Sequence, residues 1–217
     1  LPFLGLKAQE SITSDAYMYG DLSLGTGSGV FVGALSFNRL HPILNNRLHL
    51  GYGLRLNSFN GSDLTYITAP AEFTLADPPQ IDTASIGSAS SMSLSASIHL
   101  GFEISPKLLL GFNIDVIGVS FGSAQDIDIN YLHSDETATI NTTGQPTSLN
   151  VLLVGDNDIG TLNSEFYARY SLSSNFQLRG GYSLYFSEYT TELAGSDDNK
   201  RFRHKTGFPF LALSYRL

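Results

Sequence analysis

The chain has no cysteine and few charged residues. Among its 217 residues, Asp, Glu, Lys and Arg together make up only 15%, below the roughly 25% of soluble proteins. The absence of cysteine fits an oxidising envelope compartment and excludes a cysteine-based zinc site. The formal net charge of −8 argues against binding nucleic acid or anionic lipid through a basic patch.

Long apolar runs are also missing. No stretch reaches the roughly 18 apolar residues of a membrane-spanning helix, so the sequence predicts none. A chain of this kind can cross a membrane only as a β-barrel, because lipid offers no partner to an unpaired backbone group. The sequence is instead rich in residues that suit a lipid-facing sheet, with 21 Gly, 14 Phe and 11 Tyr.

The segment Gly207–Leu217 alternates between apolar and small or polar side chains. Leu211, Leu213, Tyr215 and Leu217 fall on one face, which is the period of two that defines a strand. The stripe resembles the C-terminal recognition sequence of outer-membrane β-barrels, although Leu217 stands where Phe is usual. That resemblance implies two partners, the barrel-assembly machinery and outer-membrane lipid.

The same alternation recurs upstream. In Ser91–Ile104 the even positions are apolar and the odd positions are Ser, His, Gly or Glu. This segment is longer than most soluble strands and approaches membrane-spanning length. We predict eight strands, at residues 15–24, 30–39, 47–58, 91–104, 107–121, 162–172, 176–186 and 207–217.

The connections between these segments alternate in length. Residues 41–46, 105–106 and 173–175 are short, whereas residues 60–90, 122–160 and 190–206 are long and polar. Outer-membrane barrels have short periplasmic turns and long extracellular loops. We therefore predict an all-β, antiparallel, up-and-down transmembrane β-barrel.

Strand count and domain limits leave alternatives. Residues 64–75 and 148–154 have strand character, so they either extend hairpins above the membrane or raise the count to ten. Residues 1–8 (LPFLGLKA) read as the tail of a secretory signal peptide, or else as a short apolar leader packed on the core. Residues 9–217 then form one barrel domain. The whole pattern resembles the small OmpA-, OmpX- and OmpW-type barrels, which implies the outer membrane of a Gram-negative bacterium.

The polar faces of the predicted strands consist of Ser, Gly, His, Asn and isolated charges. A soluble barrel of the lipocalin or avidin kind needs many charges of both signs on its surface, so these faces are assigned to the lumen. An eight-stranded lumen is just wide enough to be filled by side chains, and opposite charges there should pair. The residues predicted to form this network are Arg47, His49, Arg55, His99, Glu103, Asp115, Glu165, Arg169, Arg179 and Arg216.

Three functions follow from this fold. The leading hypothesis is a non-enzymatic, monomeric barrel with a plugged lumen and a structural or surface-interaction role carried by its loops. The alternative is a narrow pore or transporter for small, including hydrophobic, solutes. A third is a membrane-embedded lipid hydrolase using Ser97, His99 and Asp115 as nucleophile, base and orienting carboxylate, although a mid-lumen position offers substrate no entry.

Two pairs of loop acids, Asp126 with Asp128 and Asp156 with Asp158, supply oxygens that suit calcium but lack the spacing of a calcium loop. We expect solvated loops there, and no metal or cofactor.

Overall fold

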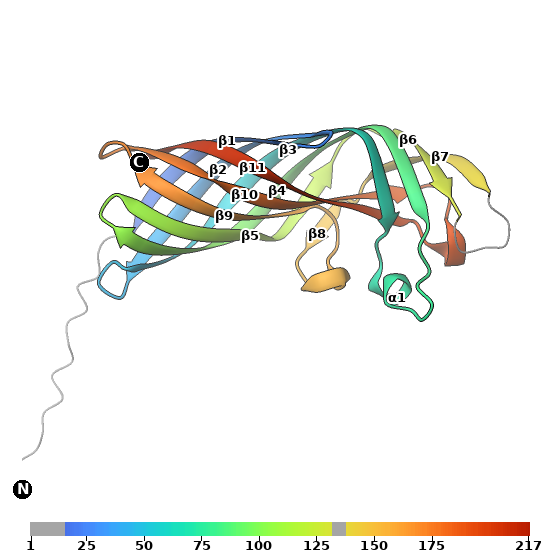
Figure 1. Cartoon of the computed structure of the whole chain (residues 1–217), viewed down its shortest axis with the longest axis horizontal. Coiled ribbons are helices and arrows are strands. Elements are labelled where there is room, and N and C mark those ends of the chain that lie inside the picture. Colours follow the sequence, from blue (N-terminus) through green and yellow to red (C-terminus); the bar gives the residue numbers. More distant parts are fainter. Residues whose placement is uncertain (1–15, 132–137) are drawn as a thin grey trace, which may run out of the picture.

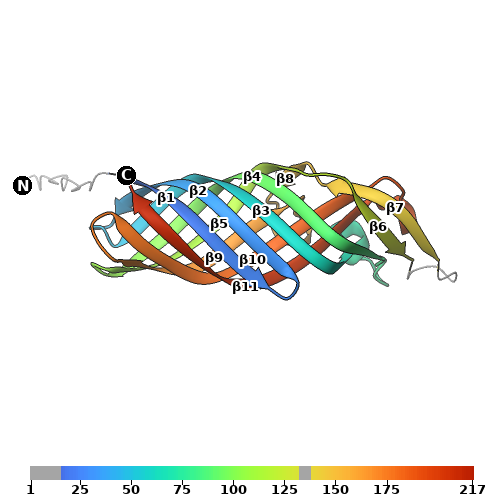
Figure 2. The same ribbon diagram turned by 90° about the horizontal axis from the view of Figure 1, so that it is seen from above.

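The computed structural model describes residues 16–131 and 138–217 as an elongated antiparallel β-barrel (Figures 1 and 2). The predicted signal-peptide remnant, residues 1–8, lies outside the described residues. The walls consist of β1 (Tyr17–Gly27), β2 (Val30–Ile43), β3 (Leu48–Thr68), β4 (Thr83–Ser105), β5 (Leu108–Phe121), β9 (Leu162–Ser171), β10 (Phe176–Thr191) and β11 (Arg201–Arg216).

These eight long strands pair in a ring. Each pairs antiparallel with the next long strand along the chain, and β11 returns to pair with β1. The prediction of eight wall strands is therefore confirmed. The short turns, residues 44–47, 106–107 and 172–175, lie together at one end of the barrel, which we call the turn end. The long connections lie at the other, the loop end (Figure 1).

The long connections carry the remaining elements. They are α1 (Ala71–Thr74), β6 (Gln125–Asn130), β7 (Thr139–Pro146), β8 (Leu149–Val151) and the single-turn 3-10 segments η1 (Gly155–Asn157) and η2 (Ser196–Asp198). Among the described residues, no helix is both long and apolar enough to cross a membrane. Of the two segments with strand character, residues 64–75 prolong β3 as far as Thr68 and then form α1, and residues 148–154 contain β8.

The strands at the loop end are longer than predicted and form a second, smaller ring. The hairpin of β1 and β2 stops at Ser28 and Gly29, where Gly29 has a φ of +68°. Beyond that turn, β3 pairs directly with β11. Six strands thus pair in a second ring, in the order β3, β4, β6, β7, β10, β11 and back to β3. An eight-strand ring at the turn end thus continues into a six-strand ring at the loop end.

On β3 and β4, the two rings turn opposite faces of the strand outward. In the eight-strand ring the apolar positions are exposed, for example Leu54 at 56% and Leu211 at 57%, whereas Asp21 on β1 is buried. On β3, two consecutive residues, Ser62 and Asp63, are both exposed, so the buried positions change from odd to even residue numbers. Gly87 and Ser88 cause the same change on β4. Above this level the apolar side chains point inward.

Candidate functional site

The interior of the eight-strand ring holds a network of buried charges from five strands. Arg55 on β3 lies 3.5 Å from Asp115 on β5, measured from Nε to Oδ1, and its Nη1 lies 3.5 Å from Glu165 Oε1 on β9. Arg179 on β10 donates to the other oxygen of Glu165 and lies 3.2 Å from Asp21 Oδ2 on β1. All five residues are at most 5% exposed. Buried charges are tolerated at such density only when each carboxylate has cationic partners.

Amide side chains complete the network. Asn113 Nδ2 donates to Glu165 Oε2 at 2.8 Å, and Asn113 Oδ1 accepts from Arg55. Asn38 Nδ2 reaches Asp21 Oδ2 at 3.4 Å. The sequence prediction missed Asp21 and Asn113, although both alternate with outward leucine or phenylalanine. Charge-assisted hydrogen bonds of this kind fix side chains more firmly than neutral ones.

Three further residues predicted to face the lumen occupy its turn end. His49 lies inside, 3.5 Å from Glu103 by Nε2 to Oε2, and its Nδ1 is 3.2 Å from the Tyr17 hydroxyl. Arg169 is buried on β9.

Arg47 and Arg216 do not join the buried network, and this corrects the prediction. Arg47 lies in the exposed turn between β2 and β3, where the alternation of a strand no longer applies. Arg216 is exposed at the end of β11 and stacks on Tyr17, with its guanidinium carbon 4.5 Å from the ring centroid.

Ser97, His99 and Asp115 all lie buried on adjacent strands, but they do not form a catalytic relay. Ser97 Oγ is 3.0 Å from His99 Nε2. Among the described residues, however, His99 Nδ1 has no hydrogen-bond partner, so no carboxylate orients the imidazole. Asp115 is engaged by Arg55 and by the backbone N–H of Asn163 at 3.2 Å.

The strand register explains why this set is not assembled. A β-bulge at Val116 pairs Ser97 with Asp115 and leaves His99 opposite Asn113. An arrangement in which the base lacks its orienting group does not support acyl transfer.

An apolar and aromatic layer fills the loop-side part of the eight-strand ring, where Phe59 pairs with Val32 on β2, and continues into the six-strand ring. Phe59 stacks on Tyr185 with centroids 5.2 Å apart and planes at 6°, and Tyr66 meets Tyr189 edge-on at 5.5 Å. The hydroxyls of the edge-on pair have partners: that of Tyr66 is 3.2 Å from Ser187 Oγ, and that of Tyr189 donates to the Ser90 carbonyl at 2.9 Å. The whole cluster comprises Val30, Val32, Phe59, Leu64, Tyr66, Ala84, Ile86, Ala89, Ile127, Ile129, Tyr185, Tyr189, Phe202 and Phe208. The sequence prediction of a polar lumen missed this layer.

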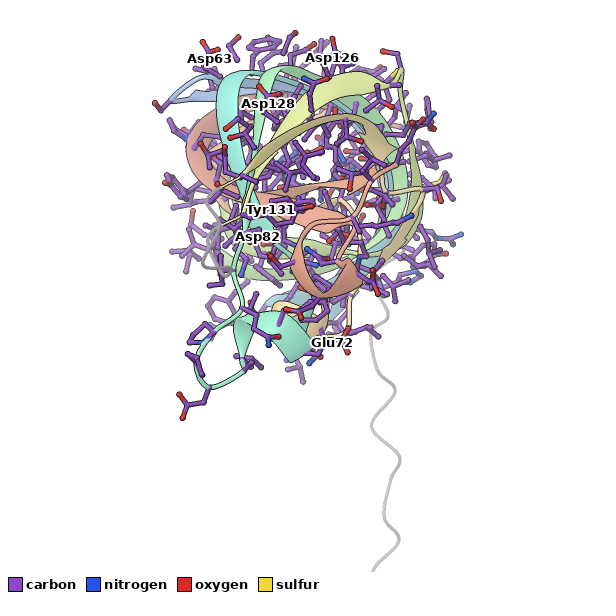
Figure 3. All side chains as sticks on the ribbon, turned by 90° about the vertical axis from the view of Figure 1, so that its right-hand side faces the viewer. Asp63, Glu72, Asp82, Asp126, Asp128 and Tyr131 are labelled. Atoms are coloured by element: carbon purple, nitrogen blue, oxygen red, sulfur yellow. The ribbon has the colours of Figure 1, made fainter. Side chains whose placement is uncertain are left out.

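The loops are tied across the loop end. The Tyr131 hydroxyl, which lies near the centre of the end-on view in Figure 3, donates to the Ala194 carbonyl at 2.8 Å. Asp82 Oδ2 accepts from the Ser196 N–H at 2.6 Å. Tyr131 lies between β6 and β7, and Asp82 lies just before β4, whereas Ala194 and Ser196 both lie between β10 and β11. These bonds therefore join loops that are distant in sequence.

The η1 segment is fastened to the outside of β10 and β11. Arg203 donates to Glu188 Oε2 at 2.8 Å and to the Asp158 carbonyl. Lys205 Nζ donates to Asp156 Oδ1 at 2.7 Å, and this ammonium group lowers the pKa of the Asp156 carboxyl. Asp128 accepts instead from Asn141 Nδ2 at 2.8 Å. Within residues 16–131 and 138–217, no group of three or more His, Asp or Glu side chains is arranged to hold a metal ion.

Comparison with known proteins gives similar structures but no sequence relative. No protein-family model matches the chain, and no curated protein matches it. Neisserial surface protein A is similar at 10% identity and a TM-score of 0.39, with 94% of this chain and 99% of that one covered. A major outer membrane protein from Thermus thermophilus is similar at 13% identity and a TM-score of 0.42, over 94% and 100%. Ail from Yersinia pestis, in a phospholipid bilayer nanodisc, has 10% identity and a TM-score of 0.42 over the same shares.

The geometry of the chain itself defines its class. Its eight-strand antiparallel ring has an apolar exterior, a polar interior, short turns at one end and long connections at the other. An apolar wall of this kind is stable in a bilayer, and these features together are those of barrels that reside in outer membranes. The chain is a small β-barrel of the outer-membrane type.

Proposed function

We propose that this protein is a monomeric, non-conducting barrel of the Gram-negative outer membrane that acts through its loop end. The observation that carries the proposal is the filling of the lumen in two layers. Ion pairs centred on Glu165 occupy the turn-side part of the eight-strand ring, and the aromatic cluster around Phe59 and Tyr185 lies above them and extends into the six-strand ring. A solute would have to displace both layers to pass.

Displacing either layer is costly. Separating a buried ion pair leaves an uncompensated charge, at a cost of roughly 3–5 kcal/mol. Opening the aromatic cluster exposes side chains whose burial contributes roughly 1.5–3 kcal/mol each. These costs argue against the narrow pore or transporter. The unassembled Ser97, His99 and Asp115 set argues against the hydrolase.

The remaining place for function is the loop end. The bonds of Tyr131 and Asp82 across the loop end, together with the tether between Arg203 and Asp158, hold the connections in one arrangement. Loops held by such bonds present a defined surface and lose little entropy on binding a partner. This supports a structural or surface-interaction role.

Assembly into the membrane is the second part of the proposal. Leu211, Leu213, Tyr215 and Leu217 are exposed in one outward row on and after β11. In that row they are accessible to the barrel-assembly machinery before they contact outer-membrane lipid.

Single-channel recording tests the plugged lumen. The protein folded into a planar bilayer should give no steady conductance steps. The variant Phe59→Ser/Tyr185→Ser/Glu165→Ser/Arg179→Ser, which places small polar groups in both layers, should give intermittent steps and so shows that the recording is sensitive enough. Leu54→Ser, on the outer face of β3, is the matched control and should remain silent. Regular steps from the unmodified protein would overturn the proposal in favour of a pore.

A further inference from the structure

Arg169, a cation in the lumen, makes no ion pair with any of the acidic residues that the structure describes. The eight-strand ring buries three arginines, Arg55, Arg169 and Arg179, and two of them contact the three buried carboxylates already described. Arg169 is only 3% exposed, yet none of its three guanidinium nitrogens has a hydrogen-bond partner among the described residues. A buried guanidinium without an acceptor is a costly exception that calls for an explanation.

Aromatic rings stabilise the face of this buried guanidinium but give its edge no hydrogen-bond acceptor. The guanidinium carbon lies 4.0 Å from the centroid of the Tyr19 ring and 5.4 Å from that of Tyr167. A ring attracts the cation through its π-electrons. It does not accept the five N–H bonds, which lie in the plane of the guanidinium and form a fork. The edge of Arg169 therefore still needs an oxygen acceptor.

The space for that acceptor lies beside Arg169. A cavity of about 120 Å³ at the turn end of the lumen is lined by Arg169, Arg216, Lys107, Glu103, His49 and Tyr17, among others. One ordered water needs roughly 10–15 Å³ of such volume, so the cavity accommodates several waters or one small anion. Three permanent cations line it against a single carboxylate, that of Glu103, which already faces His49 at 3.5 Å.

We propose that Arg169 binds an oxyanion of the phosphate or sulfate class at the turn-end mouth of the lumen. The fork of N–H donors matches two oxygens of such an anion, which is the geometry that distinguishes arginine from lysine at phosphate sites. Arg216 and Lys107 add positive charge around the entrance. The ligand supplies the acceptor that the chain lacks, so binding stabilises the folded barrel in proportion to the anion concentration.

Nuclear magnetic resonance of the arginine side chains tests this directly. The protein is folded in neutral maltoside micelles, and the Nε–Hε signal of Arg169 is followed while sodium phosphate is added. Sodium chloride at the same ionic strength is the control. The signal should shift and saturate with phosphate but not with chloride. A signal that moves identically in both salts would overturn the proposal.

Two variants separate the fork from general charge. Arg169→Lys keeps the charge and loses the paired donors, and we expect phosphate affinity to fall about tenfold, which corresponds to about one charge-assisted hydrogen bond. Arg47→Lys, in the exposed turn at the same end, should bind as the unmodified protein does. Equal affinity in all three proteins would show an unspecific charge effect and reject the site. If Arg169→Lys does not fold, the titration of the unmodified protein still decides.

A second arm identifies the source of the oxyanion. The same Nε–Hε signal is compared between maltoside micelles and phospholipid nanodiscs, both in phosphate-free buffer. A shift already present in the nanodisc identifies a lipid headgroup as the ligand, and a shift only on adding inorganic phosphate identifies a free anion. Either result supports an oxyanion at Arg169, and no shift in either arm contradicts it. This test is independent of conductance, so it can fail while the plugged lumen stands.

Discussion

The two rings of this barrel share strands but differ in which side chains those strands bury. In the eight-strand ring, β3 exposes Tyr52 and Leu54 and buries Arg55, whereas in the six-strand ring it buries Tyr66 completely. In lipid, an apolar exterior is stable, and polar groups must hydrogen-bond with one another inside the barrel. In water, the stable arrangement is the reverse, with apolar side chains in the interior. The comparison indicates that the six-strand ring is built as a small soluble core on top of a membrane barrel.

The place where the faces exchange has a simple local cause. Strand alternation can be reversed only where an extra residue is accommodated, as in a β-bulge. Ser62 with Asp63 on β3 and Gly87 with Ser88 on β4 are such irregular positions at one level, and Asp63 has a φ of +54°. Both strands therefore reverse together, so beyond this level Leu64, Tyr66 and Ile86 point into the interior.

The largest expected effect comes from removing the Glu165 carboxylate, which contacts two arginines in the eight-strand ring. Glu165→Ala leaves Arg55 and Arg179 short of a partner inside the eight-strand ring. We expect the free energy of unfolding to fall by roughly 3–5 kcal/mol, measured by urea unfolding of the protein folded in lipid vesicles. Glu103→Ala, at the partly exposed mouth, should cost less than about 1 kcal/mol. Equal losses in the two variants would mean that the network does not hold this ring together.

The matching change in the other ring is Phe202→Ala, on β11 where it pairs with β3. The Phe202 side chain is fully buried in the aromatic cluster, so its truncation should cost about 3 kcal/mol through lost burial and a residual cavity. Leu54→Ala, on the lipid-facing side of β3, should cost less than about 1 kcal/mol, because lipid fills the space that the side chain leaves. Equal effects on unfolding would contradict the assignment of the six-strand ring as a water-facing core.

Much of the membrane ring could be predicted from the sequence. A strand with a lipid-facing side shows a period of two, so Ser91–Ile104 and the other wall strands were recognisable from single residues. The asymmetry of the connections then oriented them. These features are local, and local patterns are what a single sequence reports.

The rest depended on contacts that no local pattern reports. Phe59 and Tyr185 fall on the same alternate positions as lumen-facing polar residues, so the aromatic layer was hidden within a stripe that looked polar. The pairing of β3 with β11 depends on where the hairpin of β1 and β2 stops. The partner of Asp115 likewise depends on a bulge at Val116 and on an arginine from β3.

The boundary between the rings can be located by moving one charge along one strand. Leu54→Arg places a cation on the lipid-facing wall and should cost about 2 kcal/mol, the lower limit for a midplane position. Thr65→Arg lies on the outer face of the same strand beyond the exchange at Ser62 and Asp63. It should cost less than about 0.5 kcal/mol, because that surface faces water. Unfolding in vesicles of two acyl-chain lengths sharpens the result: only the Leu54→Arg penalty should grow in the thicker bilayer, since the thicker bilayer moves that charge farther from either interface. Equal penalties at the two positions would place both rings in the same surroundings, and the exchange of faces along β3 would then need another cause.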